Sequence, residues 1–205
     1  MKNRLLLVEG KNDQHVIYAL CHAYGIAENV FDVAPAGGVD QLLDSIPVRL
    51  KQSDLKRLAV IVDADDDITR TWERLANQIR KSAMAELPRA PDVDGTCLNL
   101  KDGIRFGVWI MPDNRLTGIL EDFVARLVPT GDCLLPQVDK FLSDIPPENR
   151  RFSRQKQPKS RIHAWLAVQS DPGMPLGQAI TATFLNAQAD AVRPFIDWLH
   201  RALVH

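Results

Sequence analysis

Acidic residues gather at two places where a short apolar run of the chain ends. The apolar runs cover residues 5–8 and 58–62, and the acids that follow them are Glu9, Asp13, Asp63, Asp65 and Asp67. Short runs rich in leucine or β-branched residues are typical of buried parallel strands, whose carboxyl ends share one edge of a sheet. Carboxylates crowded at that edge repel one another unless a divalent cation neutralises them. The pattern therefore predicts a site for a hard, oxygen-binding cation: Mg²⁺, with Mn²⁺ as a substitute.

Strand and helix patterns alternate through the first part of the chain. The expected strands cover residues 4–8, 30–34 and 58–62, and the expected helices cover 13–23, the segment around 42–46, and 69–84. This order predicts an α/β fold with a mostly parallel sheet, right-handed crossovers and helices on both faces. Ligands of such sheets bind at the carboxyl ends of the strands, where both acidic groups fall.

Beyond Pro88, Pro91 and Gly95 the alternation stops. A hairpin is expected at residues 96–100 and 104–111, followed by helices at 119–128, 131–142, 161–168, 178–186 and 191–203, with a loop over 146–158. We expect an α/β catalytic core over residues 1–130, and a mainly helical extension over 131–205 packed on it.

Composition narrows the class of protein. The chain has 205 residues, 45% of them hydrophobic, and a net charge of −1, as expected for one soluble domain with an elaboration. No apolar stretch approaches the ~20 residues that span a bilayer, and the first residues lack a signal-peptide pattern. Cys21, Cys97 and Cys133 are widely spaced and odd in number, which indicates reduced thiols in a cytoplasmic protein.

Two motifs in this order resemble the Toprim domain, the catalytic module of topoisomerases, primases, RecR-type recombination proteins and OLD-family nucleases. The motifs are Val8-Glu9-Gly10-Lys11-Asn12-Asp13 and Val62-Asp63-Ala64-Asp65, with the glycine turn Gly37-Gly38 between them. The resemblance covers roughly the first half of the chain. It implies a Toprim-like fold and a Mg²⁺-dependent enzyme that cleaves phosphodiesters in DNA or RNA.

The resemblance also implies roles for individual residues. Glu9 matches the glutamate that serves as metal ligand or general acid/base, and Asp63 and Asp65 match the pair that holds Mg²⁺. Asp13 matches a further acidic position of the OLD branch. That branch adds another glutamate and a lysine, for which Glu121 and Lys159 are the best matches; the lysine would contact phosphate.

Other functions stay open at this point. The chain could be a non-catalytic Toprim scaffold of the RecR type that binds nucleic acid or a protein partner, or a nucleotidyl transferase. No GxxxxGK[ST] motif is present, so the ATPase that accompanies OLD nucleases would be a separate partner. A homodimer is the alternative to such a separate partner protein.

The acidic turn also has a structural explanation. Aspartates favour the first turn of a helix, and Asp67 is the best candidate for a helix cap, while Asp66 is expected to face solvent. A haloacid-dehalogenase pattern is disfavoured, because that superfamily has Thr or Val at the position of Asp67.

A basic segment at residues 149–162 contains no acid. Its cations other than Lys159 are Arg150, Arg151, Arg154, Lys156 and Arg161. Such a run, with Phe152 inside it, can follow a phosphate backbone and stack on a base, which predicts a contact with DNA or RNA. The alternative is a solvated loop that offsets the acidic edge.

Overall fold

A five-stranded sheet lies at the centre of the fold. The computed structural model describes residues 3–83, 85–100 and 103–205. Its strands are β1 (Arg4–Val8), β2 (Asp32–Pro35), β3 (Arg57–Asp63), β4 (Thr96–Asn99) and β5 (Arg105–Met111), in the order β2-β1-β3-β5-β4. Only β4 is antiparallel to its neighbour, β5. The predicted mixed α/β fold with a mostly parallel sheet is confirmed.

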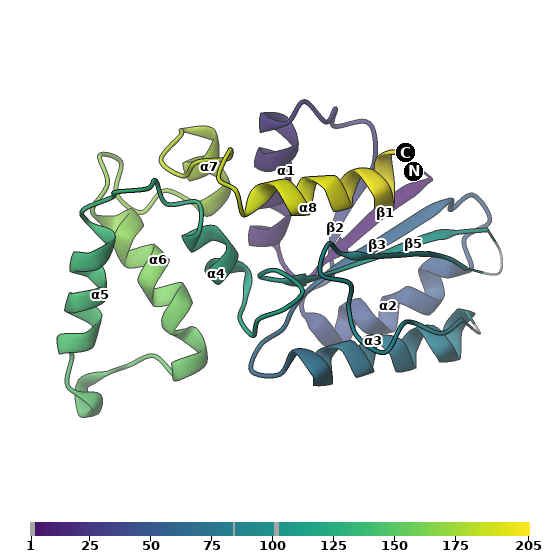
Figure 1. The fold of residues 1–205 in the computed structure, drawn as a ribbon, viewed down its shortest axis with the longest axis horizontal. Coiled ribbons are helices and arrows are strands. Elements are labelled where there is room, and N and C mark those ends of the chain that lie inside the picture. Colours follow the sequence, from purple (N-terminus) through teal and green to yellow (C-terminus); the bar gives the residue numbers. More distant parts are fainter. Residues whose placement is uncertain (1–2, 84, 101–102) are drawn as a thin grey trace.

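Helices cover both faces of the sheet (Figure 1). Helices α2 (Val39–Leu50) and α3 (Ile68–Ala83) lie on one face, and α1 (Lys11–Ala23) and α8 (Val192–Leu199) lie on the other. Side chains alternate between the two cores, because successive strand residues point to opposite faces: Leu5 and Leu7 belong to one, Leu6 and Val8 to the other.

A pair of helices stands apart from the sheet, beyond the carboxyl ends of the parallel strands (Figure 1). We call α5 (Leu135–Asp144) and α6 (Gln157–Ala167), with the 3₁₀ turns η1 (Pro147–Asn149) and η2 (Arg154–Lys156) that connect them, the helical lobe. Helix α4 (Leu120–Ala125) lies between the lobe and the sheet. Arg161 of α6 makes two hydrogen bonds to Asp139 of α5, of 2.5 and 2.8 Å, which tie the two helices together.

Element boundaries differ from the predictions where a side chain caps a helix or proline begins one. Helix α5 begins at Leu135 rather than near 131, because the Asp132 carboxylate accepts the backbone N–H groups of Leu134 and Leu135. The predicted loop over 146–158 contains two 3₁₀ turns, and α6 begins at Gln157. Pro158 is tolerated there because the first turn of a helix needs no internal N–H donor.

The last helices return to the sheet. Helix α7 (Leu176–Thr181) packs on α1, and α8 with the π-helical segment η3 (His200–Val204) packs on β3 and β5. Trp198 and Leu199 belong to the same core as Val8 and Trp109. The predicted division into two domains near residue 130 stays a prediction. Segments after residue 130 contribute to the core of the sheet.

Within the part of the chain that the structure describes, no helix combines the length and apolar character needed to cross a membrane. The three cysteines are free thiols: Cys21 is buried, Cys97 half-buried and Cys133 exposed.

Candidate functional site

Glu9 and Asp63 meet at the carboxyl edge of the sheet. Glu9 follows strand β1, and Asp63 is the last residue of the adjacent strand β3. The two strands pair in parallel from Arg4 and Arg57 onward. Oε1 of Glu9 accepts a hydrogen bond of 2.8 Å from the backbone N–H of Asp63. The glutamate side chain therefore crosses from one strand end to the other.

The glycine turn after β2 is bound to the backbone of Glu9. The N–H groups of Gly37 and Gly38 both donate to the Glu9 carbonyl oxygen, each at 2.9 Å. Their φ angles are +94° and +133°, values that residues with a Cβ rarely adopt. The glycine pair thus lines the acidic edge beside Glu9.

Helix α4 brings a second glutamate to the same edge. Oδ1 of Asp63 accepts a 2.9 Å hydrogen bond from the N–H of Leu120, the first residue of α4. The next residue, Glu121, is only 5% exposed. Its Oε1 lies 3.4 Å from Nζ of Lys159, which reaches the site from helix α6 of the lobe.

These groups line one open cavity of about 490 Å³. Its charged side chains come from the sheet edge, from two helix starts and from the lobe: Glu9, Lys11, Asp13, Asp63, Glu121 and Lys159. Asp13, in the first turn of α1, is 7% exposed, and its Oδ2 accepts a 3.0 Å hydrogen bond from the N–H of Gly10. Lys11 and Asn12 also line the cavity, although sequence reasoning gave them no role; their position inside the first motif was the available signal.

Burial and mutual repulsion raise the pKa values of three of these acids, Glu9, Asp13 and Asp63. Burial, then the charges of Asp13 and Asp65, raises the pKa of Glu9 from 4.5 to about 7, against the opposing hydrogen bond from Asp63. The pKa of Asp13 rises to about 6, mainly through burial, with Glu121 adding to the effect. Burial raises the pKa of Asp63 well above its ordinary value, and the charge of Glu9 raises it further. The carboxylates are thus close enough to sense one another.

The same side chains are not arranged as a finished metal site. In the described residues, no three acidic, histidine or cysteine side chains are grouped as they stand to hold an ion. A backbone amide engages one oxygen each of Glu9, Asp13 and Asp63, and a lysine pairs with Glu121. Shared coordination would need these side chains to turn toward one another.

Asp65 faces a different cavity. The chain leaves β3 at Asp63, and Asp65 adopts a left-handed conformation with φ +51°. Its backbone pairs with Gly118 through two hydrogen bonds of 2.9 Å. Asp65 therefore lines an adjacent cavity of about 550 Å³ with Asp66 and Arg154, although its charge still acts on Glu9.

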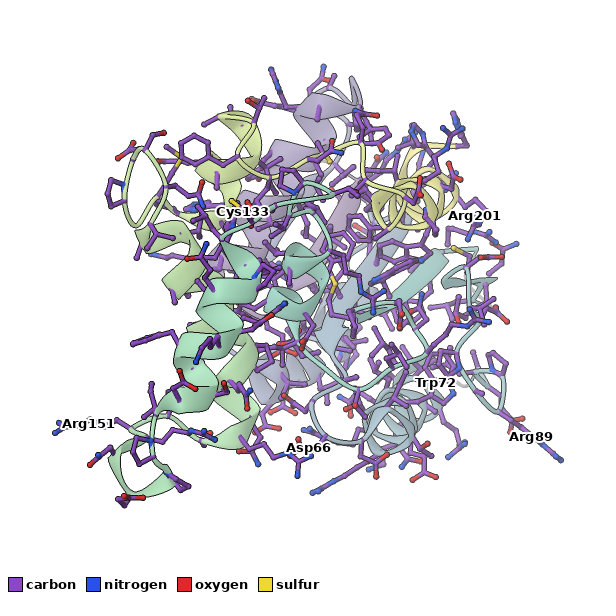
Figure 2. All side chains as sticks on the ribbon, turned by 60° about the vertical axis from the view of Figure 1, so that its left-hand side comes forward. Asp66, Trp72, Arg89, Cys133, Arg151 and Arg201 are labelled. Carbon is purple, nitrogen blue, oxygen red and sulfur yellow. The ribbon has the colours of Figure 1, made fainter. Side chains whose placement is uncertain are left out.

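The other two aspartates of the turn have local positions. Oδ1 of Asp67 accepts the N–H of Arg70 at 3.0 Å, which confirms it as a cap of α3. Asp66 is exposed and accepts a 3.1 Å hydrogen bond from Gln155 of the lobe; Figure 2 shows it on the surface.

The predicted nucleic-acid residues divide into two sets. Arg150 donates to the carbonyl groups of Leu142 and Ile145 and lies over the ring of Phe152, and Arg161 is bound to Asp139. These contacts hold two of the five cations within the lobe. Arg151, Arg154 and Lys156 are exposed, and Arg151 projects from the outer end of the lobe (Figure 2).

Residues 3–204 match the model of one protein family, described as Protein of unknown function (DUF3226). The chain belongs to the DUF3226 family. Comparison with curated proteins gives no match.

The fold of this DUF3226 protein is similar to solved structures of low sequence identity. The C-terminal region of the Xanthomonas campestris pv. campestris OLD protein is 12% identical, with a TM-score of 0.50 over 98% of this chain and 96% of that chain. The C-terminal region of the Burkholderia pseudomallei OLD protein is 13% identical, with a TM-score of 0.49 over 98% of both chains. A hypothetical protein from Pyrococcus horikoshii OT3 is 16% identical, with a TM-score of 0.49 over 98% of this chain and 95% of that chain. The first similarity shows a shared fold over nearly the whole chain.

Proposed function

We propose that this DUF3226 protein is a Mg²⁺-dependent, Toprim-type enzyme that cleaves phosphodiesters in DNA or RNA. The observation that carries the proposal is the cavity in which Glu9, Asp13, Asp63 and Glu121 lie with Lys159. Four acids from three separate segments repel one another there, and a divalent cation relieves that repulsion. The sequence motifs that resemble Toprim and the fold shared with an OLD C-terminal region support the same function.

The donor set fits a hard cation. All four acids offer carboxylate oxygens, which Mg²⁺ and Mn²⁺ prefer, and no thiol or imidazole lines this cavity among the described residues. Glu9, Asp13, Asp63 and Glu121 would hold the ion, with Asp65 adding negative charge from the adjacent cavity. A bound ion of this kind neutralises charge on a phosphodiester and lowers the pKa of a bound water.

The chain's own residues supply the remaining requirements. Lys159 is 51% exposed, so its ammonium group can donate to a phosphate oxygen from the edge of the cavity. The exposed cations of η2, Arg154 and Lys156, directly precede α6, the helix that carries Lys159. They would hold the nucleic-acid backbone beside the cavity. The hydrogen bond from Asp63 to Glu9 and the two amides of the glycine turn fix the glutamate relative to the sheet edge.

A plasmid and a structured RNA, each incubated with Mg²⁺ or Mn²⁺, test the proposal. We expect cleavage by the wild-type protein, and a loss of at least about 100-fold in Glu9→Gln and Asp63→Asn. Glu86→Gln and Asp54→Asn, which change exposed acids away from the cavity, are the matched controls. Unchanged cleavage by a folded Glu9→Gln/Asp63→Asn double variant would refute the assignment.

One observation favours a second candidate function, a Toprim scaffold that binds nucleic acid without cleaving it. The acids are paired internally, with Lys159 on Glu121 and backbone amides on the others. Binding of nucleic acid by the wild-type protein without cleavage under either metal would support the scaffold.

A further inference from the structure

A second charged cavity lies at the opposite, amino-terminal edge of the sheet. Its volume is about 650 Å³. Among the described residues it is lined by five cations and by no aspartate or glutamate, and the cations are Arg4, Lys56, Arg57, Arg105 and Arg201. Arg201 lies on the side of the molecule opposite Arg151 of the lobe, so this surface is separate from the basic segment at 149–162 (Figure 2).

The strand register forces three of these arginines together. Arg4, Arg57 and Arg105 are the first residues of β1, β3 and β5, and they occupy in-register positions on adjacent parallel strands. Neighbouring strands are ~4.8 Å apart, and like charges placed directly opposite each other on a sheet destabilise it. The crowding is reflected in the lowered pKa of Arg57, caused first by burial and then by Arg4 and Arg105.

Part of this cluster has a structural role. Arg4 donates to the carbonyl groups of Leu203 and Val204, and Arg57 donates to those of Ala202 and His205, so both bind the end of the last helical segment. The contacts of the other three cations do not involve the end of that segment. Arg105 contacts the side chain of Asn99, Arg201 contacts backbone carbonyls at residues 94 and 95, and Lys56 is exposed. None of the five forms an ion pair with an aspartate or glutamate side chain among the described residues.

We propose that this cavity binds a compact anion carrying two or more phosphate groups. Guanidinium groups bind phosphate oxygens through paired N–H donors, and several such groups around a concavity match a multiply charged anion better than a single charge. The described lining offers no tryptophan, tyrosine or phenylalanine on which a base would stack, and its imidazole, His205, already stacks on His200 with ring centroids 5.2 Å apart, so recognition is directed at the phosphates. A nucleoside polyphosphate and a free inorganic polyphosphate share this chemistry.

Isothermal titration calorimetry with sodium tripolyphosphate, in a buffer that contains EDTA, tests the proposal. EDTA prevents a metal–polyphosphate complex from binding at the acidic cavity, so the result is independent of the proposed nuclease function. We expect saturable one-to-one binding that weakens at least about tenfold in Lys56→Gln/Arg105→Gln. Arg80→Gln/Arg89→Gln removes the same charge from exposed positions elsewhere and should bind like the wild-type protein.

Further arms identify the source of the phosphates. Arg201→Gln changes one exposed residue and should also weaken binding, which covers the case in which the double variant misfolds. Binding of ATP at least about tenfold tighter than that of tripolyphosphate would identify a nucleoside polyphosphate, whereas equal or weaker binding of ATP would identify an inorganic polyphosphate. Absence of saturable tripolyphosphate binding, an equal loss in the control pair, or binding of long oligonucleotides alone would overturn the proposal.

Discussion

The carboxylate of Glu9 accepts the backbone N–H of Asp63 at 2.8 Å, so the acid that follows β1 fixes the end of β3. Glu9 therefore combines a structural hydrogen bond with a charge that burial and neighbouring acids make unfavourable. A side chain that keeps the acceptor and loses the charge separates these two contributions.

Glu9→Gln should make the metal-free protein more stable near neutral pH. The amide oxygen can still accept from Asp63, while the repulsion with Asp13 and Asp63 is removed. We expect the free energy of unfolding to rise by about 1–3 kcal/mol in urea titrations with EDTA. Glu9→Ala leaves the buried N–H of Asp63 without its acceptor and should lose about 1–3 kcal/mol instead. Equal stability of the two variants would contradict this account.

Metal-free protein should lose stability as pH rises. The pKa of Glu9 is raised from 4.5 to about 7, so the folded state holds this proton more tightly than the unfolded chain. The stabilisation is complete below pH 4.5 and is lost as pH rises through about 7. Because a pKa difference of one corresponds to about 1.4 kcal/mol, Glu9 alone contributes on the order of 3 kcal/mol.

Thermal unfolding from about pH 5 to about pH 8 measures this effect. Mn²⁺ or Mg²⁺ should raise the melting temperature mainly at the alkaline end, where the carboxylates are ionised and can bind the ion. The profile of Glu9→Gln should be flatter. A wild-type protein that gains stability toward pH 8 in EDTA would count against the crowded carboxylates.

Lys159→Gln should impair cleavage with little effect on stability. The ammonium group lies 3.4 Å from Oε1 of the buried Glu121 but is itself 51% exposed, so water weakens the ion pair and its loss should cost about 1 kcal/mol or less. Without this positive charge beside the cavity, the phosphate of the substrate is stabilised less well, and we expect a rate loss of about 10–100-fold. Lys140→Gln, which breaks an exposed ion pair with Asp144 in the lobe and lies outside the acidic cavity, is the matched control in the same assay. Equal losses in the two variants would remove Lys159 from the site.

Gly38→Ala should damage both the fold and the activity. Gly38 has φ +133°, and its N–H donates to the carbonyl of Glu9. An added Cβ would also lie 3.0 Å from Oε1 of Gln41. We expect a loss of about 1–3 kcal/mol in chemical denaturation, together with slower cleavage. Gly25→Ala, at φ +69° after α1 with nothing within 4 Å of an added Cβ, should cost about 1 kcal/mol and leave cleavage unchanged.

The exposed cations of η2 should determine the salt dependence of nucleic-acid binding. Arg154→Gln/Lys156→Gln removes two charges beside the acidic cavity without breaking an ion pair among the described residues. We expect the slope of log K against log salt to fall by about 1–2, since each phosphate contact contributes about 0.7–0.9. Arg161→Gln should instead loosen α5 from α6 and lower the melting temperature. An unchanged slope in the double variant would place the strand elsewhere.

The convergence of Glu9 and Asp63 could be predicted because it depends only on strand order. Both residues come at the ends of short apolar runs, and a parallel sheet brings such ends to one edge. The position of Asp65 could not be predicted in this way. Residues two apart share a face only while the strand continues, and β3 ends at Asp63 before a left-handed turn at Asp65.

The position of Lys159 depends on long-range packing that periodicity does not encode. Helix α6 reaches the cavity because the lobe folds back past α4, and only the family resemblance selected this lysine among the cations of its segment. The contacts of Arg150 were equally hidden, because its partners are the carbonyl groups of Leu142 and Ile145, and every residue has a backbone carbonyl.

The acidic cavity is assembled from segments that are far apart along the chain. Glu9, Asp63, Glu121 and Lys159 come together only when the sheet, α4 and the lobe are all in place. An occupant that contacts all four segments would therefore oppose local opening of each of them. Amide hydrogen exchange in β1, β3, α4 and α6 would then slow together when the cavity is occupied. Such a common change would show that these segments open cooperatively.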